Sequence, residues 1–512
     1  MRYSTVLALS IIGIHCGIEA AIVNSRSFTS CGYLNKKIFC FGGDLSSSIA
    51  AFDLDNKLYS LDIEQFYGGE SNSFNNKWIG ITSNNDFDPE KRRTPEFMAT
   101  PNGDNFLLVG GYSGYSSLIN QTIMYNADNN TWEALPRYSE PNRGYRQIYF
   151  GTAVNLLSTT NDTVGFYGGY EANPDVNIPM VSVTNQTIPL SSDDNTSIRG
   201  FDSITIFNTT SKEWSYFTPQ QSIPKNYYAS AFTATLNSET GIIYYLGGNY
   251  YTSKSINPIK LAFNQAHVFD TTQGQWGIAQ LKAGPSSRIP SNRIYHSATM
   301  LPNSQDILLY GGTADENIAV TDFIYTLNLV TNNWTEQTNI NVPASVTQNG
   351  ARFGHSAVLV NTTLFILFGK DLNGNPTPNL LTFDVANVSN IEYTPTYPLN
   401  PTEKSSSAKV LSDAALAGII TGAVILVIAV ALGCFFFYKK THTSEHEEDE
   451  DEMVMHVDWK VIEDQYREEL PTGHYAQAYG QTLDAYSPHM QNPYNAHTNN
   501  AYIQKPHSPS VY

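Results

Sequence analysis

Apolar and polar positions alternate in short blocks along this chain from about residue 26 to residue 398. Runs of β-branched and aromatic residues are bounded by Gly, Asn, Asp or Ser, and no amphipathic helical stretch interrupts them. This pattern predicts β-strands joined by turns, and hence an all-β fold. Six runs share a similar ending, five in a glycine pair and the sixth in Gly-Lys. They cover residues 38–43, 106–111, 164–169, 243–248, 307–312 and 365–370.

A second signal follows these runs. In four units an aromatic or aliphatic residue precedes a tryptophan by seven positions. The first unit stretches this spacing from Tyr59 to Trp78, and the sixth keeps Phe383 but has Asn390 at the tryptophan position. Self-similarity on this scale predicts a fold made of repeated units. The four regular pairs are Tyr125 and Trp132, Phe207 and Trp214, Phe269 and Trp276, and Leu327 and Trp334.

The unit resembles the kelch repeat, in which a hydrophobic strand ends in Gly-Gly and is followed by a spaced Tyr and Trp. The resemblance covers roughly residues 26–398. It implies a β-propeller, a ring of four-stranded sheets with each tryptophan packed between neighbouring blades. Independent hairpins in a β-sandwich would not repeat the glycine pair and the tryptophan. Kelch-like groups also precede units five and six: Arg293 with His296 and Ser297, and Arg352 with His355 and Ser356.

The number of blades is less clear than the architecture. The units are 58 to 79 residues apart, longer than the roughly 50 residues of a kelch repeat, so we expect expanded loops. Six blades are expected. A seventh would require a degenerate unit within residues 60–100 or 170–205.

Both ends of the chain carry membrane signals. Residues 1–20 contain Arg2, then an apolar stretch, then a small-residue cleavage site. This order predicts a secretory signal peptide, and an uncleaved anchor is the alternative. Residues 414–438 contain no charge and are followed by Lys439 and Lys440, which predicts a transmembrane helix with the lysines on the cytoplasmic side. We therefore expect a type I membrane protein at the cell surface, with a propeller ectodomain (21–398), a stalk (399–413) and a cytoplasmic tail (439–512).

Cysteine usage agrees with secretion. Without the signal peptide and the membrane span, Cys31 and Cys40 are the two cysteines of the ectodomain. If Asn35 and Lys36 form a two-residue hairpin turn, Cys31 faces Cys40 in a non-hydrogen-bonded pair, where Cα atoms are closest. An oxidising compartment would then favour a disulfide over two free thiols.

Nine sequons of the form Asn-x-Ser/Thr also fit this orientation, and none lies in the tail. Attached sugars require exposed turns, so several sequons at corresponding places in the repeat support both the topology and the repeat. Chance sequons in an Asn-rich chain are the alternative. The predicted glycosylation sites are Asn120, Asn129, Asn161, Asn185, Asn195, Asn208, Asn333, Asn361 and Asn387.

The charge and composition of the chain limit the classes of partner that it is expected to bind. The net charge of −18 argues against nucleic acid. Gly418 and Gly422 form a GxxxG step that allows a homodimer through the membrane helix. The tail has an acidic cluster and a Tyr-, Asn-, His- and Pro-rich end, a composition that predicts disorder and allows a cytoplasmic adaptor to bind.

Catalytic signals are weak. The chain resembles galactose oxidase only through its kelch repeats, and that enzyme holds copper with two histidines and two tyrosines, one crosslinked to a cysteine. The ectodomain has three histidines, His267, His296 and His355, and its two cysteines are better explained as a disulfide. We find no phosphate loop, GxSxG elbow or HExxH pair, and we expect neither a metal nor another cofactor.

The sequence thus predicts a non-enzymatic surface propeller that recognises a protein or glycan through its loops, with a signalling or scaffolding tail. A sorting or scaffold protein that acts through its tail is the first alternative, and a copper enzyme is a distant one. The layout resembles single-pass kelch-repeat membrane proteins of fungi. The candidate binding loops are residues 70–78, 111–119, 169–202, 249–260 and 312–320.

Overall fold

The structure is a computed structural model. The expected signal peptide, stalk, membrane span with Gly418 and Gly422, and tail lie outside the residues that it describes. Within the described stretches, no helix has the length and apolar character needed to cross a bilayer. These stretches are residues 23–48, 51–101, 103–114, 116–140, 144–156, 162–172, 180–181, 187–188, 200–224, 228–252, 255–343 and 350–397.

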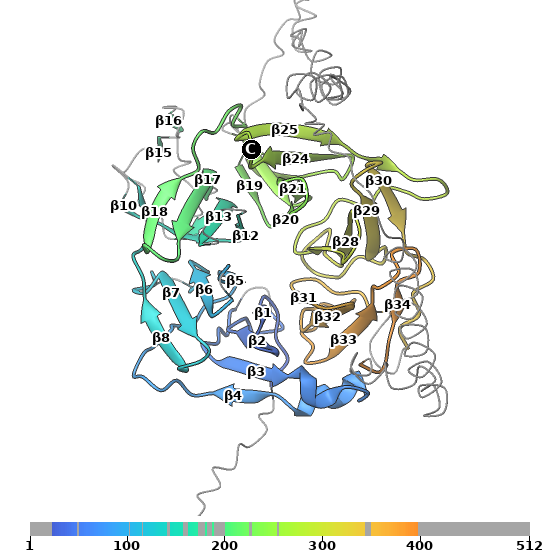
Figure 1. Cartoon of the computed structure of the whole chain (residues 1–512), viewed down its shortest axis with the longest axis horizontal. Coiled ribbons are helices and arrows are strands. Elements are labelled where there is room, and N and C mark those ends of the chain that lie inside the picture. The colour runs from blue at the N-terminus through green and yellow to red at the C-terminus, as the bar shows by residue number, and fades with distance from the viewer. Residues whose placement is uncertain are drawn as a thin grey trace, which may run out of the picture. The chain divides into compact units, whose positions relative to one another are not determined.

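In the described part of the chain, six antiparallel sheets stand around a common centre and form the blades of a propeller (Figure 1). Each blade contains four strands that follow the chain order from the innermost to the outermost. Blade 1 contains β1 (Ser30–Leu34), β2 (Lys37–Phe41), β3 (Leu58–Asp62) and β4 (Ile79–Ile81). Blade 2 contains β5 (Glu96–Ala99), β6 (Asn105–Val109), β7 (Thr122–Asn126) and β8 (Thr131–Ala134). Blade 3 contains β12 (Thr152–Asn155), β13 (Thr163–Gly168), β17 (Phe201–Asn208) and β18 (Glu213–Tyr216).

The other three blades repeat the arrangement, and the sheet of blade 5 gains β26 (Lys282–Ala283), which pairs parallel to its outermost strand. Blade 4 contains β20 (Thr233–Asn237), β21 (Ile242–Leu246), β24 (Gln265–Asp270) and β25 (Gln275–Gln280). Blade 5 contains β27 (Ser297–Met300), β28 (Asp306–Tyr310), β29 (Ile324–Asn328) and β30 (Asn333–Glu336). Blade 6 contains β31 (Ser356–Val360), β32 (Thr363–Leu367), β33 (Leu380–Asp384) and β34 (Glu392–Tyr393).

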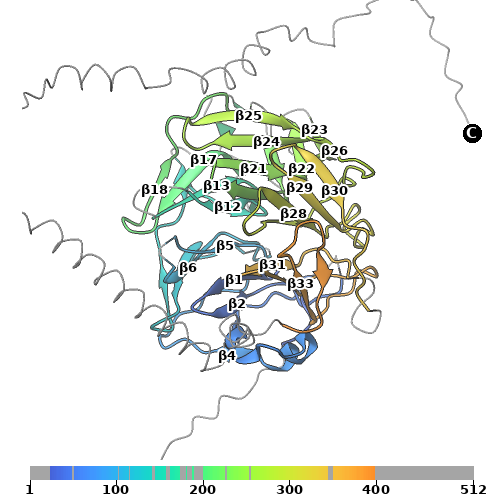
Figure 2. The same ribbon diagram turned by 45° about the vertical axis from the view of Figure 1, so that its right-hand side comes forward.

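The innermost strands close the ring. Each of β1, β5, β12, β20, β27 and β31 contacts the next, and β31 returns to β1; Figure 2 shows β1, β5 and β31 close together. Among the described residues no blade borrows a strand from the other end of the chain, because blade 1 is built from the first described segment and blade 6 from the last. Instead, blades 6 and 1 share an apolar cluster. Backbone bonds also join Gly68 to Tyr397 and Tyr397 to Gly69, both 2.9 Å long.

The glycine runs provide a repeated bond between blades. In each blade the second glycine, or Gly369 in blade 6, donates its N–H to a carbonyl of the next blade. Such a bond needs no side chain, so it can recur where the side chains differ. The pairs are Gly43 with Arg92 (3.0 Å), Gly111 with Ile148 (2.8 Å), Gly169 with Ala229 (2.8 Å), Gly248 with Arg293 (3.1 Å), Gly312 with Arg352 (2.8 Å) and Gly369 with Arg26 (2.9 Å).

Four buried arginines brace the same turns. In blades 1, 2, 5 and 6 the arginine Nη1 donates to the carbonyl at the first position of the glycine pair of its own blade, over 3.0 to 3.2 Å. A buried carbonyl would otherwise lack a partner. The sequence drew attention to two of these arginines, and the structure adds the other two. They are Arg26 with Gly42, Arg92 with Gly110, Arg293 with Gly311, and Arg352 with Phe368.

The tryptophans pack between blades, as the repeat implied. Trp132 of blade 2 lies 5.5 Å from Phe41 of blade 1. Trp276 of blade 4 lies 4.7 Å from Tyr167 of blade 3. Within blades 2 to 5 the residue seven positions earlier lies directly opposite the tryptophan across the outer hairpin. These registers are Tyr125 with Trp132, Phe207 with Trp214, Phe269 with Trp276, and Leu327 with Trp334.

The two irregular units differ from the sequence expectation in informative ways. In blade 1 two short 3₁₀ helices, η1 (Ile63–Phe66) and η2 (Ser71–Asn76), fill the stretched interval. Trp78 still packs against blade 6, with its ring 5.7 Å from Phe368. In blade 6 the aromatic partner of Phe383 is Tyr393, not the residue at Asn390. An aromatic side chain therefore closes blade 6 after a longer turn, which the fixed seven-residue spacing missed.

Neither candidate interval holds a seventh blade among the described residues. Residues 60–100 supply η1, η2, β4 and β5. The interval 170–205 contains β14 (Tyr170–Ala172), the hairpin β15 (Met180–Val181) and β16 (Thr187–Ile188), and the start of β17. The long spacing between units thus comes from loops.

The antiparallel order gives the propeller two unlike faces. The glycine runs, the loops between second and third strands, and the segments leading into the innermost strands lie on one face, here called the glycine face. The opposite face carries the remaining hairpin turns. Blades 3 and 4 extend on the glycine face, because β11 (Gln147–Tyr149) pairs with β14, and β19 (Tyr228–Ser230) pairs with β22 (Asn249–Thr252), itself paired with β23 (Ser255–Lys260). A further short pair joins β9 (Ser139–Glu140) to β10 (Gly144–Tyr145).

A disulfide joins Cys31 to Cys40, with the Cα atoms 4.1 Å apart. The register of β1 and β2 places these residues opposite each other. Asn35 and Lys36 both have positive φ, of 47° and 66°, as expected for a two-residue hairpin turn. The bond therefore lies where the hairpin argument from the sequence placed it, within the first blade.

The glycine turn makes one stability prediction. A Cβ on Gly110 would lie 1.8 Å from the Ile148 carbonyl oxygen of the next blade. We expect Gly110→Ala to lower the free energy of unfolding by about 2–4 kcal/mol, from left-handed strain plus the forced backbone shift. Gly103→Ala is the matched control, because Gly103 also has positive φ but no neighbour within 4 Å; it should cost about 1 kcal/mol. Equal losses in urea titrations of the two variants would contradict the role given to the blade junction.

The disulfide makes a second prediction. Replacing both Cys31 and Cys40 with serine should lower the free energy of unfolding by roughly 2–3 kcal/mol, because the unfolded chain regains the freedom of the closed loop. Denaturation of the wild type should shift by a similar amount on adding a thiol reductant, whereas the double variant should not respond. A wild-type protein insensitive to reductant would contradict a structural disulfide.

Candidate functional site

The centre of the glycine face is closed by side chains at six equivalent positions. Each position lies two residues after the carbonyl that accepts the blade-to-blade glycine bond, and each has positive φ between 50° and 58°. Five of the six are not glycine, so this backbone conformation carries strain that the surrounding ring must hold in place. The side chains alternate between aromatic and small around the ring. They are Phe28, Thr94, Phe150, Ala231, Tyr295 and Gly354.

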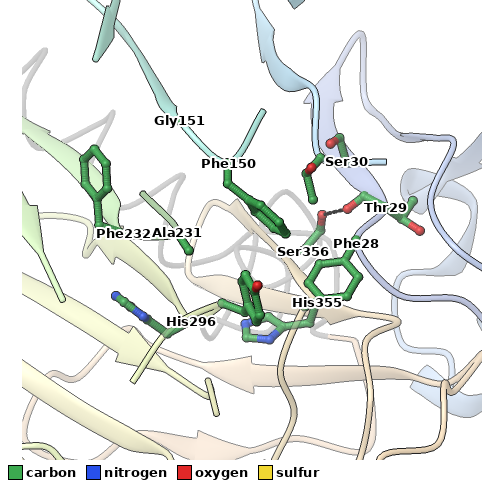
Figure 3. Close-up of a pocket in the computed structure, with 13 residues that line it drawn as sticks. Phe28, Thr29, Ser30, Phe150, Gly151, Ala231, Phe232, His296, His355 and Ser356 are labelled. Carbon is green, nitrogen blue, oxygen red and sulfur yellow. Dashed lines mark hydrogen bonds between the residues drawn. The ribbon is translucent and has the colours of Figure 1, made fainter. Parts of the chain in front are cut away.

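The three aromatic residues at these positions meet at the centre and form what we call the aromatic plug. The ring centroids of Phe150 and Tyr295 are 4.7 Å apart, those of Phe28 and Tyr295 are 5.0 Å apart, and those of Phe28 and Phe150 are 5.7 Å apart. A cavity of about 190 Å³ lies against the plug, where Figure 3 shows Phe28 and Phe150 with His296 and His355. The small residues of blades 2, 4 and 6 leave this space.

A second ring lies two residues further along each innermost strand. Five of its members carry hydroxyls and the sixth is Glu96. Ser30 donates to Pro95 of blade 2, and Ser356 donates to Thr29 of blade 1, over 3.2 and 2.5 Å. These bonds again join neighbouring blades, so the inner ring is part of the scaffold as well as of the cavity. The members are Ser30, Glu96, Thr152, Thr233, Ser297 and Ser356.

Three titratable groups here, the half-buried Glu96 and His355 and the buried His296, are set to be neutral. Burial raises the pKa of Glu96 to about 8, although the Gly151 backbone amide lowers it in part. Burial lowers the pKa of His296 to about 3, and the nearby Arg293 lowers it further. Burial likewise lowers the pKa of His355 to about 3. At neutral pH the Glu96 carboxyl of the inner ring is thus uncharged, as are the imidazoles of His296 and His355, which directly precede the inner-ring residues Ser297 and Ser356.

The rim outside the plug is aromatic and charged. The Arg93 guanidinium lies 4.0 Å from the Phe52 centroid and 5.1 Å from that of Tyr112, and Nη1 contacts Asp44 Oδ2 at 3.0 Å. The aromatic series continues into blade 3, since Tyr112 and Tyr149 have centroids 5.3 Å apart. It reaches blade 4 through Tyr170 and Tyr251, whose hydroxyls are 2.8 Å apart. Such rings offer flat apolar contacts beside polar groups.

The histidines considered from the sequence hold structural contacts. His296 Nε2 lies 3.1 Å from the Leu246 carbonyl oxygen, and His355 Nε2 lies 2.8 Å from Ser297 Oγ. His267 lies in β24 of blade 4, where burial lowers its pKa to about 4. Among the residues that the structure describes, no three His, Cys, Asp or Glu side chains gather as metal ligands would.

The described sequons lie mainly on the opposite face. Asn129, Asn361 and Asn387 are exposed in hairpin turns there. Asn208 and Asn333 are half-buried beside outer turns of the same face, whereas the half-buried Asn120 lies on the glycine face. Asn161, Asn185 and Asn195 fall outside the described residues. Glycosylation of these sites stays a prediction.

Four of the five candidate loops share one face. The described parts of residues 111–119, 169–202, 249–260 and 312–320 all follow the second strand of a blade, so they lie on the glycine face. Residues 70–78 instead connect β3 to β4 and therefore lie on the opposite face. There Ser71 donates to Pro395 of blade 6, and the loop helps to close the ring. The sequence could not separate this loop from the others, because expanded length alone does not reveal the face.

The plug residues were not found from the sequence. A signal for them exists, because in four blades a buried arginine precedes the inner-ring residue by four positions and the plug position lies midway. Blades 3 and 4 break that spacing, so sequence comparison would locate Phe28 and Tyr295 but not Phe150. The four arginine–inner-ring pairs are Arg26 with Ser30, Arg92 with Glu96, Arg293 with Ser297, and Arg352 with Ser356.

Comparison with known families agrees with the geometry. Residues 233–424 match the family model described as the KLHDC2/KLHL20/DRC7 Kelch-repeats domain. The match supports a kelch-repeat protein. Kelch-repeat domains of this kind are typically protein-binding and non-enzymatic. No curated protein matches the chain.

Glu96 makes a prediction about pH. Its pKa in the folded propeller is about 8, above that of a free glutamate, so its stabilising effect is complete below about pH 4 and is lost as the pH rises through 8. Between pH 5 and 8, we expect wild-type stability to fall relative to Glu96→Gln by up to about 1.4 kcal/mol per pH unit. Denaturant titrations at several pH values measure this slope.

The control is Glu213→Gln, at an exposed glutamate of β18; its profile should follow the wild type. The lowered pKa values of His296 and His355 act in the opposite direction, since their contribution is present above about pH 6.5 and is lost toward pH 3. Because Glu96→Gln leaves both histidines in place, their contribution cancels in the comparison. Parallel wild-type and Glu96→Gln profiles would show that the Glu96 carboxyl is ionised in the fold.

Proposed function

We propose that this protein is a non-enzymatic recognition propeller that binds a protein or glycan partner through the glycine face. The observation that carries the proposal is the unequal build of the two faces. The glycine face holds the described parts of four of the five expanded loops, the extended strands of blades 3 and 4, and the aromatic rim. Binding sites on rigid scaffolds are commonly built from such loops.

Exposed apolar side chains and sequons support the same face. Phe52, Ile119, Ile259 and Ile318 are exposed by 37%, 76%, 45% and 49%, and all four lie in segments between second and third strands. Large exposed apolar groups on neighbouring loops are typical of partner-binding surfaces. Sugars at Asn129, Asn361 and Asn387 would lie on the opposite face, and among the described sequons only Asn120 would place a sugar on the glycine face.

We further propose that the propeller is displayed outside the cell by a membrane helix at residues 414–438. The uncharged segment with its following lysines, the disulfide and the absence of sequons from residues 439–512 support this placement. A cytoplasmic adaptor binding the tail would couple recognition to signalling or scaffolding. In the alternative, a sorting or scaffold protein, the tail is the working part and the glycine face has no partner.

The copper-enzyme alternative has less support. Both described cysteines are joined to each other, so neither has a free thiol for the crosslink to tyrosine that galactose oxidase requires. Copper analysis of the purified protein would test this alternative directly.

Partner capture tests the recognition function. The full-length protein would be displayed multivalently and used to bind cell-surface extracts and glycan arrays. We expect Ile119→Asp with Ile318→Asp to weaken capture at least tenfold, because charges would replace exposed apolar groups on two loops of the glycine face.

The matched control is Ile278→Asp with Val330→Asp. These residues are exposed by 54% and 75%, and they lie on an outermost strand and on a turn of the opposite face. The control changes charge and apolar exposure similarly, so it should capture like the wild type. Equal capture by all three proteins would place the partner elsewhere, and no capture by the folded wild type would favour the tail as the working part.

A further inference from the structure

Lys370 is an unusual residue at the rim of the glycine face. It follows Gly369 in blade 6, and its backbone pairs with Phe353 through bonds of 2.8 and 3.0 Å. Only 4% of its surface is exposed, yet its ammonium group has no hydrogen-bond or ion-pair partner among the described residues. The equivalent residues of the other blades are not basic; they are Asp44, Tyr112, Tyr170, Asn249 and Thr313.

The neighbours of Lys370 do not supply its missing counter-charge. Burial lowers the pKa of the Lys370 amine. The negative charge of Asp44 raises this pKa and the positive charge of Arg93 lowers it, so both members of the Arg93–Asp44 pair act on the ammonium. Asp44 Oδ2 already contacts Arg93 at 3.0 Å. Its Oδ1 accepts the backbone N–H groups of Ser46 and Asp53, over 3.0 and 3.2 Å. Two cations thus share one carboxylate whose oxygens are both engaged.

Arg93 shows the same excess of donors. Its Nε is buried and has no acceptor among the described atoms. A buried charge or donor without a partner is unfavourable, and such groups are normally paired in folded proteins. These donors come from blades 6 and 2. Lys370 and Asp44 hold corresponding positions after the glycine runs of the adjacent blades 6 and 1, where their backbones pair with Phe353 and Ser27, and Arg93 contacts Asp44 at 3.0 Å.

We propose that Lys370 and Arg93 form a binding site for a single carboxylate group of a ligand on the glycine face. One negative charge balances the local excess of one positive charge. The nearby Asp44 carboxylate would disfavour a doubly charged phosphate. A carboxylate also accepts charge-assisted hydrogen bonds from an ammonium and a guanidinium at once.

The surroundings define the rest of the ligand. The Phe52 and Tyr112 rings both lie within 5.1 Å of the Arg93 guanidinium and contact each other edge to face, with centroids 5.2 Å apart; both are partly exposed. A carboxylate attached to a hydrocarbon or sugar body would place that body on these rings. The inference deepens the proposed function and rests on it for biological meaning, because it names the charge of the group that the glycine face binds.

Ligand-dependent stability tests the site in the full-length protein. The probes are propionate with its neutral analogue propionamide, and glucuronate with neutral glucose, all at one ionic strength. A ligand that binds only the folded state raises the unfolding midpoint. We expect propionate, glucuronate or both to raise the midpoint, whereas the neutral analogues should not; which acid acts distinguishes a side-chain-like carboxylate from a sugar acid.

Variants of Lys370 assign the effect. Lys370→Met should weaken the apparent affinity for the active carboxylate at least tenfold, and Lys370→Arg, which keeps the charge, should retain binding. Lys282→Met is the control at an exposed lysine of β26, and it should respond like the wild type. Without ligand, Lys370→Met should differ little in stability from the wild type, because the Lys370 ammonium makes no hydrogen bond or ion pair with the described residues.

Several results would overturn the site. They are equal responses to the charged and neutral probes, an unchanged response in Lys370→Met, or a lower midpoint of Lys370→Met in the absence of ligand. Failure of the recognition function is distinguishable: a carboxylate response without partner capture would keep the site and reject recognition. Partner capture by a wild type whose unfolding midpoint does not respond to either carboxylate probe would keep the recognition function and reject the site.

Discussion

The bond from a glycine N–H to a carbonyl of the next blade is the interaction on which the rest of the structure depends. It occurs six times and closes the ring when Gly369 of blade 6 donates to Arg26 of blade 1. Its geometry brings two backbones together, and on Gly110 a Cβ would lie 1.8 Å from the acceptor oxygen. In blade 6 Phe368 takes the first glycine position with a φ of 59°. Its side chain is accommodated between Arg26 and Trp78.

This bond also determines the architecture of the candidate site. The acceptor residue is followed two positions later by the left-handed residue that faces the centre, and four positions later by the inner-ring residue. The ring of backbone bonds therefore fixes the positions of the aromatic plug and of the inner ring. It does not constrain the side chains of the rim outside them. The centre is filled by the aromatic plug, so groups such as Arg93, Asp44 and Lys370 lie on the rim, where the loops differ most between blades.

The repeat made much of the fold predictable from the sequence. The glycine runs, the tryptophan spacing and the hairpin between Cys31 and Cys40 all involve contacts between residues close in sequence, so periodicity reveals them. Contacts between distant segments were not predictable in this way. One such contact is the packing of residues 70–78 against blade 6. Another is the pairing of Phe383 with Tyr393, where the seven-residue spacing had pointed to position 390. Both depend on how the first and last blades meet.

The sequence by itself determined the blade unit, the chain order of the strands, the disulfide register and the segments that would become loops, because each follows from local periodicity and turn chemistry. Only the tertiary structure decided which loops share a face, which residues form the aromatic plug, and that Lys370 lies beside Asp44 and Arg93. Those three residues are separated by up to 326 positions (370 − 44). Their proximity arises from ring closure, and no local pattern in the chain encodes which residues closure brings together.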